Sequence, residues 1–316
     1  ARVTSARPTR FMKVTCLECP VKPPLSPKPD QSMSNSNPPE TVQQPATLEA
    51  MQAAHRYCDL ARAVVLPHFR TAIRIENKSD EANATGAFGH DPVTQADREA
   101  EQRIRAAIER DFPNDGFIGE ETGSVRLKAE HRWIVDPIDG TRAFVTGSPL
   151  WGTLIARLKA DRPKLGFMDQ PFTQERFWSD GLTSFYARGN GEQIRDGEKI
   201  ATRQNVDLAQ ATLSTTHPDL FPTRDTAEAF KAVAARVKTV RYGGDCYGYA
   251  LLANGGIDVI IEAGLKVYDI AALIPIIECA GGVITDWNGN RISDGGNVVA
   301  SGSQQLHAQV LDALKV

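Results

Sequence analysis

The chain has 316 residues, of which 41% are hydrophobic, and its 36 basic and 39 acidic residues give a net charge of −3. This composition excludes a wholly disordered or fibrous protein. The slight negative charge offers no general attraction to a polyanion, so we expect no nucleic-acid partner. No apolar stretch reaches the ~18 residues that a membrane helix needs, so we also expect no membrane partner.

The first 46 residues differ from the rest of the chain. They contain nine of the 19 prolines and no glycine, and they carry a charge of +3 against −6 for the remainder. Without an apolar period they cannot offset the entropy of ordering, so we predict a disordered tail. The tail is either an upstream extension or, because its first part is basic, an organelle transit segment. We therefore expect a cytoplasmic protein, or a plastid or other organelle if the tail is a transit peptide.

After the tail, hydrophobic periodicity predicts a mixed α/β fold. Helices are expected over residues 47–67 and 95–110, joined by a polar loop over 77–91 that we expect to carry function. Strands are expected over 117–118, 133–135, 150–158, 165–168 and 175–178. From Ala211 strands at 213–215, 240–242, 259–262, 283–286 and 298–300 alternate with helices at 225–236, 245–253, 269–280 and 303–314. We predict one domain over 47–316 with two lobes, about 47–200 and 201–316.

Two aspartates stand at the end of the apolar run at 133–135. Pro137 favours an extended conformation at Asp136, and the following turn allows Asp139 to point back toward it. Gly140 permits close approach of a ligand, and a helix starting after it would offer free N–H groups to an anion. Acids beside an anion-binding turn indicate a metal-phosphate site; the structural alternative is an ordinary turn with Asp136 as a cap.

Other acids follow the same pattern. Glu120 and Glu121 come after a short apolar strand, and Asp269 precedes an apolar helix face, where its structural alternative is an N-cap. Adjacent like charges repel unless they are solvated or neutralised by a cation. Hard carboxylate ligands suit Mg²⁺.

These residues carry a resemblance to the inositol monophosphatase superfamily. Its motifs are matched in order by residues 91–97 (DPVTQAD), 119–122 (GEET), 136–141 (DPIDGT) and 268–272 (YDIAA), within a similarity that extends from about 48 to 315. Segments 136–144, 149–155, 168–171, 243–247 and 262–266 are most similar to the histidinol-phosphate phosphatase branch. The resemblance implies a layered αβαβα sandwich of the inositol monophosphatase/fructose-1,6-bisphosphatase type, commonly a homodimer.

The resemblance also implies roles for individual residues. Two or three Mg²⁺ ions would be held by Glu120, Asp136, Asp139, Asp269 and the carbonyl of Ile138. Thr141 and Asp97 would orient and deprotonate the attacking water, assisted by Glu120. The phosphate would lie against Asp139, Gly140 and Thr141, and Arg142 pairs either with it or with a neighbouring acid. Asp245 and Glu262 would bind the alcohol half, unless they only cap a helix and end a strand.

The leading hypothesis is Mg²⁺-dependent hydrolysis of a small phosphate monoester, L-histidinol phosphate, to L-histidinol and phosphate in histidine biosynthesis. An inositol monophosphatase or a 3'(2'),5'-bisphosphate nucleotidase is the enzymatic alternative. A catalytically silent regulatory relative is the third hypothesis, and the presence of every acid of the metal motifs argues against it.

Overall fold

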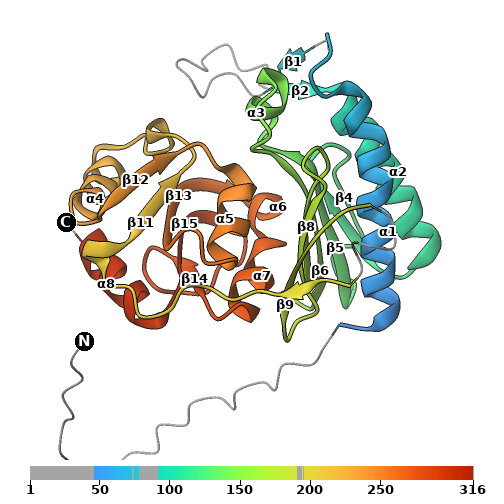
Figure 1. Ribbon diagram of the computed structural model, residues 1–316. Helices are drawn as coiled ribbons and strands as arrows, with labels where there is room; N and C mark the ends of the chain where they lie inside the picture. The colour runs from blue at the N-terminus through green and yellow to red at the C-terminus, as the bar shows by residue number, and fades with distance from the viewer. Residues whose placement is uncertain (1–45, 73–74, 78–91, 191–193, 195, 316) are drawn as a thin grey trace, which may run out of the picture. The chain divides into compact units, whose positions relative to one another are not determined.

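Eight strands form the larger sheet of the computed structural model, which describes residues 46–72, 75–77, 92–190, 194 and 196–315 (Figure 1). All of the predicted tail except Ala46, and nearly all of the predicted loop, with Asp91, lie outside these residues. The sheet order is β10-β9-β8-β7-β6-β5-β3-β4, and only β3 and β5 pair in parallel. Its strands are β3 (Gly116–Gly119), β4 (Ser124–Val125), β5 (His131–Asp139), β6 (Gly152–Lys159), β7 (Arg162–Gln170), β8 (Glu175–Ser179), β9 (Ser184–Arg188) and β10 (Glu198–Lys199).

The second sheet has five strands in the order β12-β11-β13-β15-β14. They are β11 (Thr212–Thr215), β12 (Thr239–Tyr242), β13 (Val259–Lys266), β14 (Val283–Asp286) and β15 (Gly295–Ser301). β11 runs parallel to β12 and β13, whereas β15 is antiparallel to β13 and β14. A separate antiparallel pair joins β1 (Ile75–Asn77) to β2 (Pro92–Thr94).

Helices cover both sheets in layers (Figure 1). On the outer face of the larger sheet lie α1 (Leu48–Val65) and α2 (Gln95–Asp111); α4 (Arg224–Ala234) and α8 (Gln304–Leu314) cover the outer face of the smaller one. Between the sheets lie α5 (Asp245–Ala253), α6 (Val267–Ile270) and α7 (Leu273–Cys279), while α3 (Thr141–Thr146) follows β5. Short 3₁₀ turns occur at Leu66–His68, Leu208–Gln210 and Pro218–Leu220. This is the expected αβαβα sandwich.

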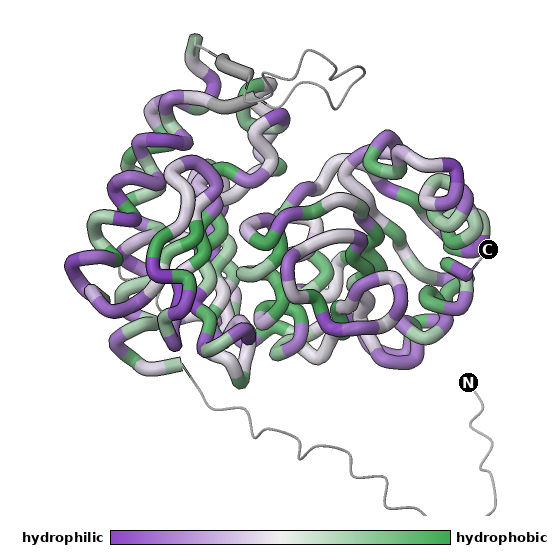
Figure 2. Tube along the Cα trace, turned by 180° about the vertical axis from the view of Figure 1, so that it is seen from behind, coloured by the Kyte–Doolittle hydropathy of each residue, from purple (hydrophilic) through white to green (hydrophobic). Residues whose placement is uncertain are grey.

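Strand periodicity distributes the apolar residues between these layers. Trp133 and Val135 of β5 pack in the cluster beneath α1 and α2, whereas Ile134 packs in the cluster between the sheets. In β13, Ile260 faces the middle layer and Ile261 faces the outer helices. Figure 2 shows hydrophobic residues gathered in the inner strands and helices, and many hydrophilic residues along the outer helices. Alternate residues of each strand thus stabilise different layers.

The single helix expected over 269–280 is wrong, because α6 and α7 are separate helices. The physical reason is Pro275, which lacks the N–H that would bond to the carbonyl of Ala271 and whose ring would crowd that carbonyl. The break places Pro275 in the first turn of α7, where proline is tolerated. The other helices predicted within the described residues are confirmed with small shifts at their ends.

No helix within the described ranges is long and apolar enough to cross a lipid bilayer.

A buried histidine in α8, on the outer face of the smaller sheet, should make the free energy of unfolding depend on pH. His307 of α8 is 1% exposed, and its ring nitrogens contact the hydroxyls of Thr285 (2.9 Å) and Ser301 (3.2 Å). Burial lowers its pKa from 6.5 to about 4. Between these values the unfolded chain binds a proton at His307 that the folded chain does not, so the contribution of His307 to stability falls as the pH falls.

At 1.36 kcal/mol per pH unit, this loss approaches about 3 kcal/mol near pH 4. We expect the unfolding free energy of His307→Gln, relative to that of the wild type, to rise by about this amount as the pH falls from about 6.5 to 4, measured by urea titration at each pH. The control is His68→Gln at a half-buried position, which should keep the wild-type slope. Equal slopes for both variants would contradict the prediction.

Candidate active site

One cavity of about 640 Å³ collects most of the predicted site residues. Its wall combines the end of β5 and the start of α3 with the loop after β11, the start of α5, and the segment from β13 to α6. The predicted residues in its lining are Glu120, Asp136, Ile138, Asp139, Gly140, Thr141, Arg142, Asp245, Glu262 and Asp269. Residues from both sheets therefore meet at one cavity.

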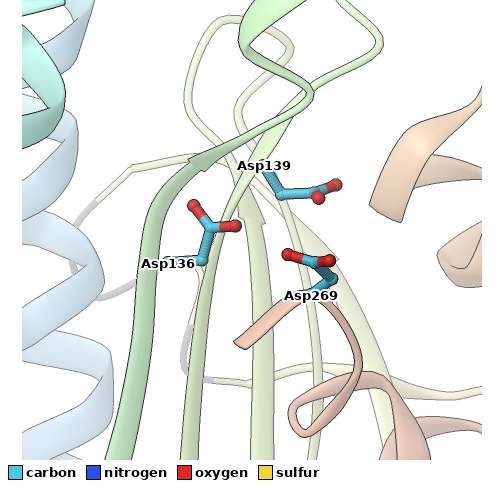
Figure 3. Close-up of side chains that lie close together, drawn as sticks. All are labelled: Asp136, Asp139 and Asp269. Carbon is cyan, nitrogen blue, oxygen red and sulfur yellow. The ribbon is translucent and has the colours of Figure 1, made fainter. Parts of the chain in front are cut away.

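A bulge in β5 directs two aspartates to the same place. Asp136 pairs with Leu154 of β6 and Asp139 pairs with Gly152, so three steps on one strand oppose two on the other. In a regular strand residues three apart lie on opposite faces; the additional residue removes this offset. The N–H of Ile138 donates to Asp136 Oδ1 (3.0 Å) and stabilises the turn. Figure 3 shows both carboxylates approaching Asp269.

Asp269 reaches the same point from α6. Its Oδ2 accepts the N–H of Lys266 (2.7 Å), an arrangement that fixes the carboxylate at the start of this single-turn helix. Asp269 is thus the third residue of the helix and not its N-cap. Carboxylate oxygens of Asp136, Asp139 and Asp269 all lie within 4.8 Å of one another.

Glu120 joins this cluster from the loop after β3. Its N–H donates to the carbonyl of Val135 in β5 (3.3 Å), and its side chain lines the cavity. The next two residues are held by Glu101, a fully buried residue of α2 that accepts the N–H groups of Glu121 (2.8 Å) and Thr122 (2.6 Å). Glu101 therefore orders the loop that carries Glu120.

Mutual repulsion and burial dominate the electrostatics of the cluster. Burial, then the charges of Glu120, Asp139 and Asp269, raises the pKa of Asp136 well above its ordinary value. Burial and the charge of Asp245 raise the pKa of Asp139 to about 8, and burial and Asp139 raise the pKa of Asp269. A bound divalent cation would relieve the repulsion among these buried carboxylates. Carboxylate oxygens are also the ligands that a hard cation prefers, so these residues fit Mg²⁺.

A tight turn places backbone N–H groups beside the acids. Gly140 has φ +83°, and a Cβ there would lie 3.0 Å from the carbonyl oxygen of Leu150 and 3.1 Å from Asp245, so glycine is required. The Thr141 hydroxyl donates to the carbonyl of Ile138 (3.0 Å), one of the predicted ligands. The charge of Arg142 lowers the pKa of Asp245, so Arg142 lies close enough to this acid to stabilise its charged form.

A second pair of acids lies in the same cavity. Burial and the charge of Glu262 raise the pKa of Asp245 to about 7, and burial raises the pKa of Glu262. Asp245 is the first residue of α5, whose N-cap is Gly244, so it is not the cap of its helix. Glu262 lies inside β13 and does not end that strand. The next N–H of α5, from Cys246, donates to Asp139 (2.7 Å) and links this pair to the aspartate cluster.

Asp97 lies outside the lining of this cavity. It is fully buried in the first turn of α2, where Oδ2 accepts the N–H (2.9 Å) and hydroxyl (2.5 Å) of Thr94. Its assignment to the attacking water remains a prediction.

Several lining residues were not predicted. Thr216, His217 and Leu220 come from the loop after β11, Tyr249 from α5 and Lys266 from the end of β13. His217 is exposed and also lines the cavity. The loop after β11 has no motif that could have signalled its residues. Only Tyr249, four residues after Asp245 on one predicted helix, had a signal in the sequence, because residues four apart share a helix face.

The fold and the acid cluster define a phosphatase of the inositol monophosphatase type, and comparison with known proteins agrees. The family model described as "Inositol monophosphatase family" matches residues 47–315. The chain therefore belongs to the inositol monophosphatase family.

Individual relatives include both types of phosphatase considered above. The chain is 41% identical over 269 residues to the "Bifunctional phosphatase IMPL2, chloroplastic" of Arabidopsis thaliana, covering 81% of this chain and 72% of that protein. It is 37% identical to a histidinol-phosphatase of Mycobacterium tuberculosis, covering 71% and 84% of the two chains. A solved inositol monophosphatase from Zymomonas mobilis is similar with a TM-score of 0.72 and 37% identity, covering 85% of this chain and 98% of that one.

Proposed function

We propose that this phosphatase hydrolyses L-histidinol phosphate to L-histidinol and phosphate, with Mg²⁺ as its cofactor and histidine biosynthesis as its context. The observation that carries the proposal is the pair of buried acids, Asp245 and Glu262, in the same cavity as the aspartate cluster. The similarity to a histidinol-phosphatase supports it.

The charges of the substrate match the two acid groups. L-histidinol phosphate has an ammonium and an imidazole on its alcohol half, whereas inositol has only hydroxyls. Burial penalises the charged forms of Asp245 and Glu262, and a cation bound between them would offset that penalty. A neutral alcohol would bring no positive charge to either carboxylate.

The reacting half would be held by the first acid group and the turn beside it. Glu120, Asp136, Asp139, Asp269 and the carbonyl of Ile138 would hold Mg²⁺, which supplies Lewis acidity and neutralises the roughly −1.5 to −2 charge of the phosphate. The N–H groups of Gly140 and Thr141 would bind phosphate oxygens. The Thr141 hydroxyl, held by Ile138, and Asp97 would orient and deprotonate the attacking water.

Three further proposals accompany this function. We propose a homodimer, a phosphatase domain over 47–316 with two lobes, and a separate tail over 1–46. Since the similar IMPL2 is described as chloroplastic, the basic tail is proposed as a transit segment, with a cytoplasmic location as the alternative.

A substrate panel tests the proposed function. Phosphate release is measured with L-histidinol phosphate, inositol 1-phosphate and 3'-phosphoadenosine 5'-phosphate, each with Mg²⁺ and with a chelator. We expect the highest kcat/KM for L-histidinol phosphate and no turnover with the chelator.

Clear preference for inositol 1-phosphate would instead establish the alternative that the Zymomonas mobilis structure favours. Preference for the nucleotide would indicate a bisphosphate nucleotidase. Absence of turnover with every ester at saturating Mg²⁺ would indicate a silent relative.

A further inference from the structure

We infer that Thr216 is a positioning residue that fixes Glu262 and Asp245 in the cavity and thereby determines selectivity for a cationic alcohol. The inference rests on the proposed function and adds a residue to it. Thr216 follows β11 and lines the cavity. β11 and β13 pair in parallel, with Ser214 opposite Ile260. Because the two chains run in the same direction, Thr216 and Glu262, each two residues further on, lie beside each other.

Three hydrogen bonds hold the Glu262 carboxylate. The N–H and the hydroxyl of Thr216 both donate to Oε1, at 3.0 Å and 2.5 Å, and the Tyr249 hydroxyl donates to Oε2 at 3.1 Å. An ionised carboxylate accepts only, whereas the neutral acid must donate one proton. Three donors therefore favour the charged form, against the burial that opposes it.

The side chain of Thr216 also binds the backbone of the second acid, Asp245. The N–H of Asp245 donates to Thr216 Oγ1 (3.1 Å), so the single hydroxyl proton is free to point at Glu262. Asp245 has φ +44°, a left-handed conformation that non-glycine residues rarely adopt. The bond to Thr216 thus secures a strained residue at the start of α5 and orders both acids through one side chain.

Removal of the hydroxyl should separate binding of the cation from the chemistry. Thr216→Val keeps the shape and the N–H but loses the donor to Glu262 and leaves the Asp245 N–H without its acceptor. A hydrogen bond to a charged group is worth about ten-fold to a hundredfold in affinity. We expect KM for L-histidinol phosphate to rise by that factor with kcat changed by at most about three-fold. For inositol 1-phosphate, kcat/KM should fall by a smaller factor than for L-histidinol phosphate.

Conservative and neighbouring variants complete the test. Thr216→Ser restores the hydroxyl and should restore KM. Thr215→Val is the matched control, because Thr215 is 1% exposed and its hydroxyl has no hydrogen-bond partner among the described residues. In a Glu262→Gln background, Thr216→Val should raise KM by a smaller factor than in the wild type, because only the bond to Asp245 then distinguishes the two proteins. If Thr216→Val melts far below the wild type, Thr216→Ala replaces it.

Calorimetric binding of L-histidinol distinguishes the two possible failures. Wild-type protein that binds L-histidinol while Thr216→Val binds it equally well would overturn the role of Thr216 alone. Wild-type protein that neither binds L-histidinol nor prefers its phosphate would overturn the proposed function, and the role of Thr216 with it. Weaker binding by Thr216→Val with recovery in Thr216→Ser would support the inference.

Discussion

Replacement of Asp136 by Asn should reduce kcat by about a thousandfold or more without unfolding the protein. Loss of a single group that stabilises transition-state charge has an effect of this size. Asp136 is 2% exposed, and its carboxylate lies in the cluster with Asp139 and Asp269. Asparagine has the same shape and can still accept the N–H of Ile138, so the loss falls on cation binding rather than on packing.

The same substitution should not destabilise the metal-free protein. Burial, then the charges of the neighbouring acids, raises the pKa of Asp136, so asparagine replaces a group whose charged form is disfavoured in the metal-free protein. Thermal melts should show a midpoint equal to or above that of the wild type without Mg²⁺. Wild-type protein should gain stability as Mg²⁺ is added, because the folded state alone binds it, and the variant should gain far less.

An exposed carboxylate provides the control. Asp312→Asn on α8 makes the same chemical change outside the cavity and should keep both the turnover and the Mg²⁺-dependent shift. Turnover by Asp136→Asn that recovers at saturating Mg²⁺ would show that the cation is held elsewhere.

Replacement of Asp169 by Asn should cost about 3–5 kcal/mol of the free energy of unfolding, the usual loss when one partner of a buried ion pair is removed. Asp169 is fully buried in β7 and binds two arginines. Its Oδ1 accepts from Arg176 (2.7 Å) and Arg62 (2.8 Å), and its Oδ2 accepts from Arg62 (3.3 Å). Arg176 is itself fully buried, so in the variant its positive charge would lose the negative charge of Asp169, and water could not reach it to take that place.

Urea titration of the purified variant measures the loss. Asp161→Asn is the control, because Asp161 also pairs with an arginine, Arg132, but its side chain is 89% exposed. Exposed pairs contribute little, so the control should unfold at the wild-type midpoint. An unchanged midpoint for Asp169→Asn would mean that Asp59, the other acid bound to Arg176, compensates its charge alone.

Residues whose role follows from local chain geometry could be predicted from the sequence. Asp136 and Asp139 stand at the end of an apolar run with a proline between them, and Asp269 begins an apolar helix face; the structure brings all three together. The break in the helix after Ile270 could also have been predicted, because Pro275 has no N–H to donate to the carbonyl of Ala271. The grouping of the acids as one metal site came from resemblance to a family, because spacing alone left turns and caps open.

Residues whose role depends on pairing between distant strands could not be predicted. Thr216 stands in a short polar loop with no periodicity, and its contact with Glu262 exists because β11 and β13 are parallel neighbours. Glu101 appears in the sequence as one of several charged residues on an exposed helix. Only the tertiary structure buries it against the loop at Thr122.

The bulge between Asp136 and Asp139 makes this stretch intolerant of changes in length. Because side chains alternate along a strand, deletion or insertion of one residue there would turn one aspartate toward α1 and α2, where Trp133 and Val135 pack. A buried carboxylate among apolar groups would replace a metal ligand, so a single codon gained or lost would cost both catalysis and folding. Substitutions at Pro137 or Ile138 could still preserve the register.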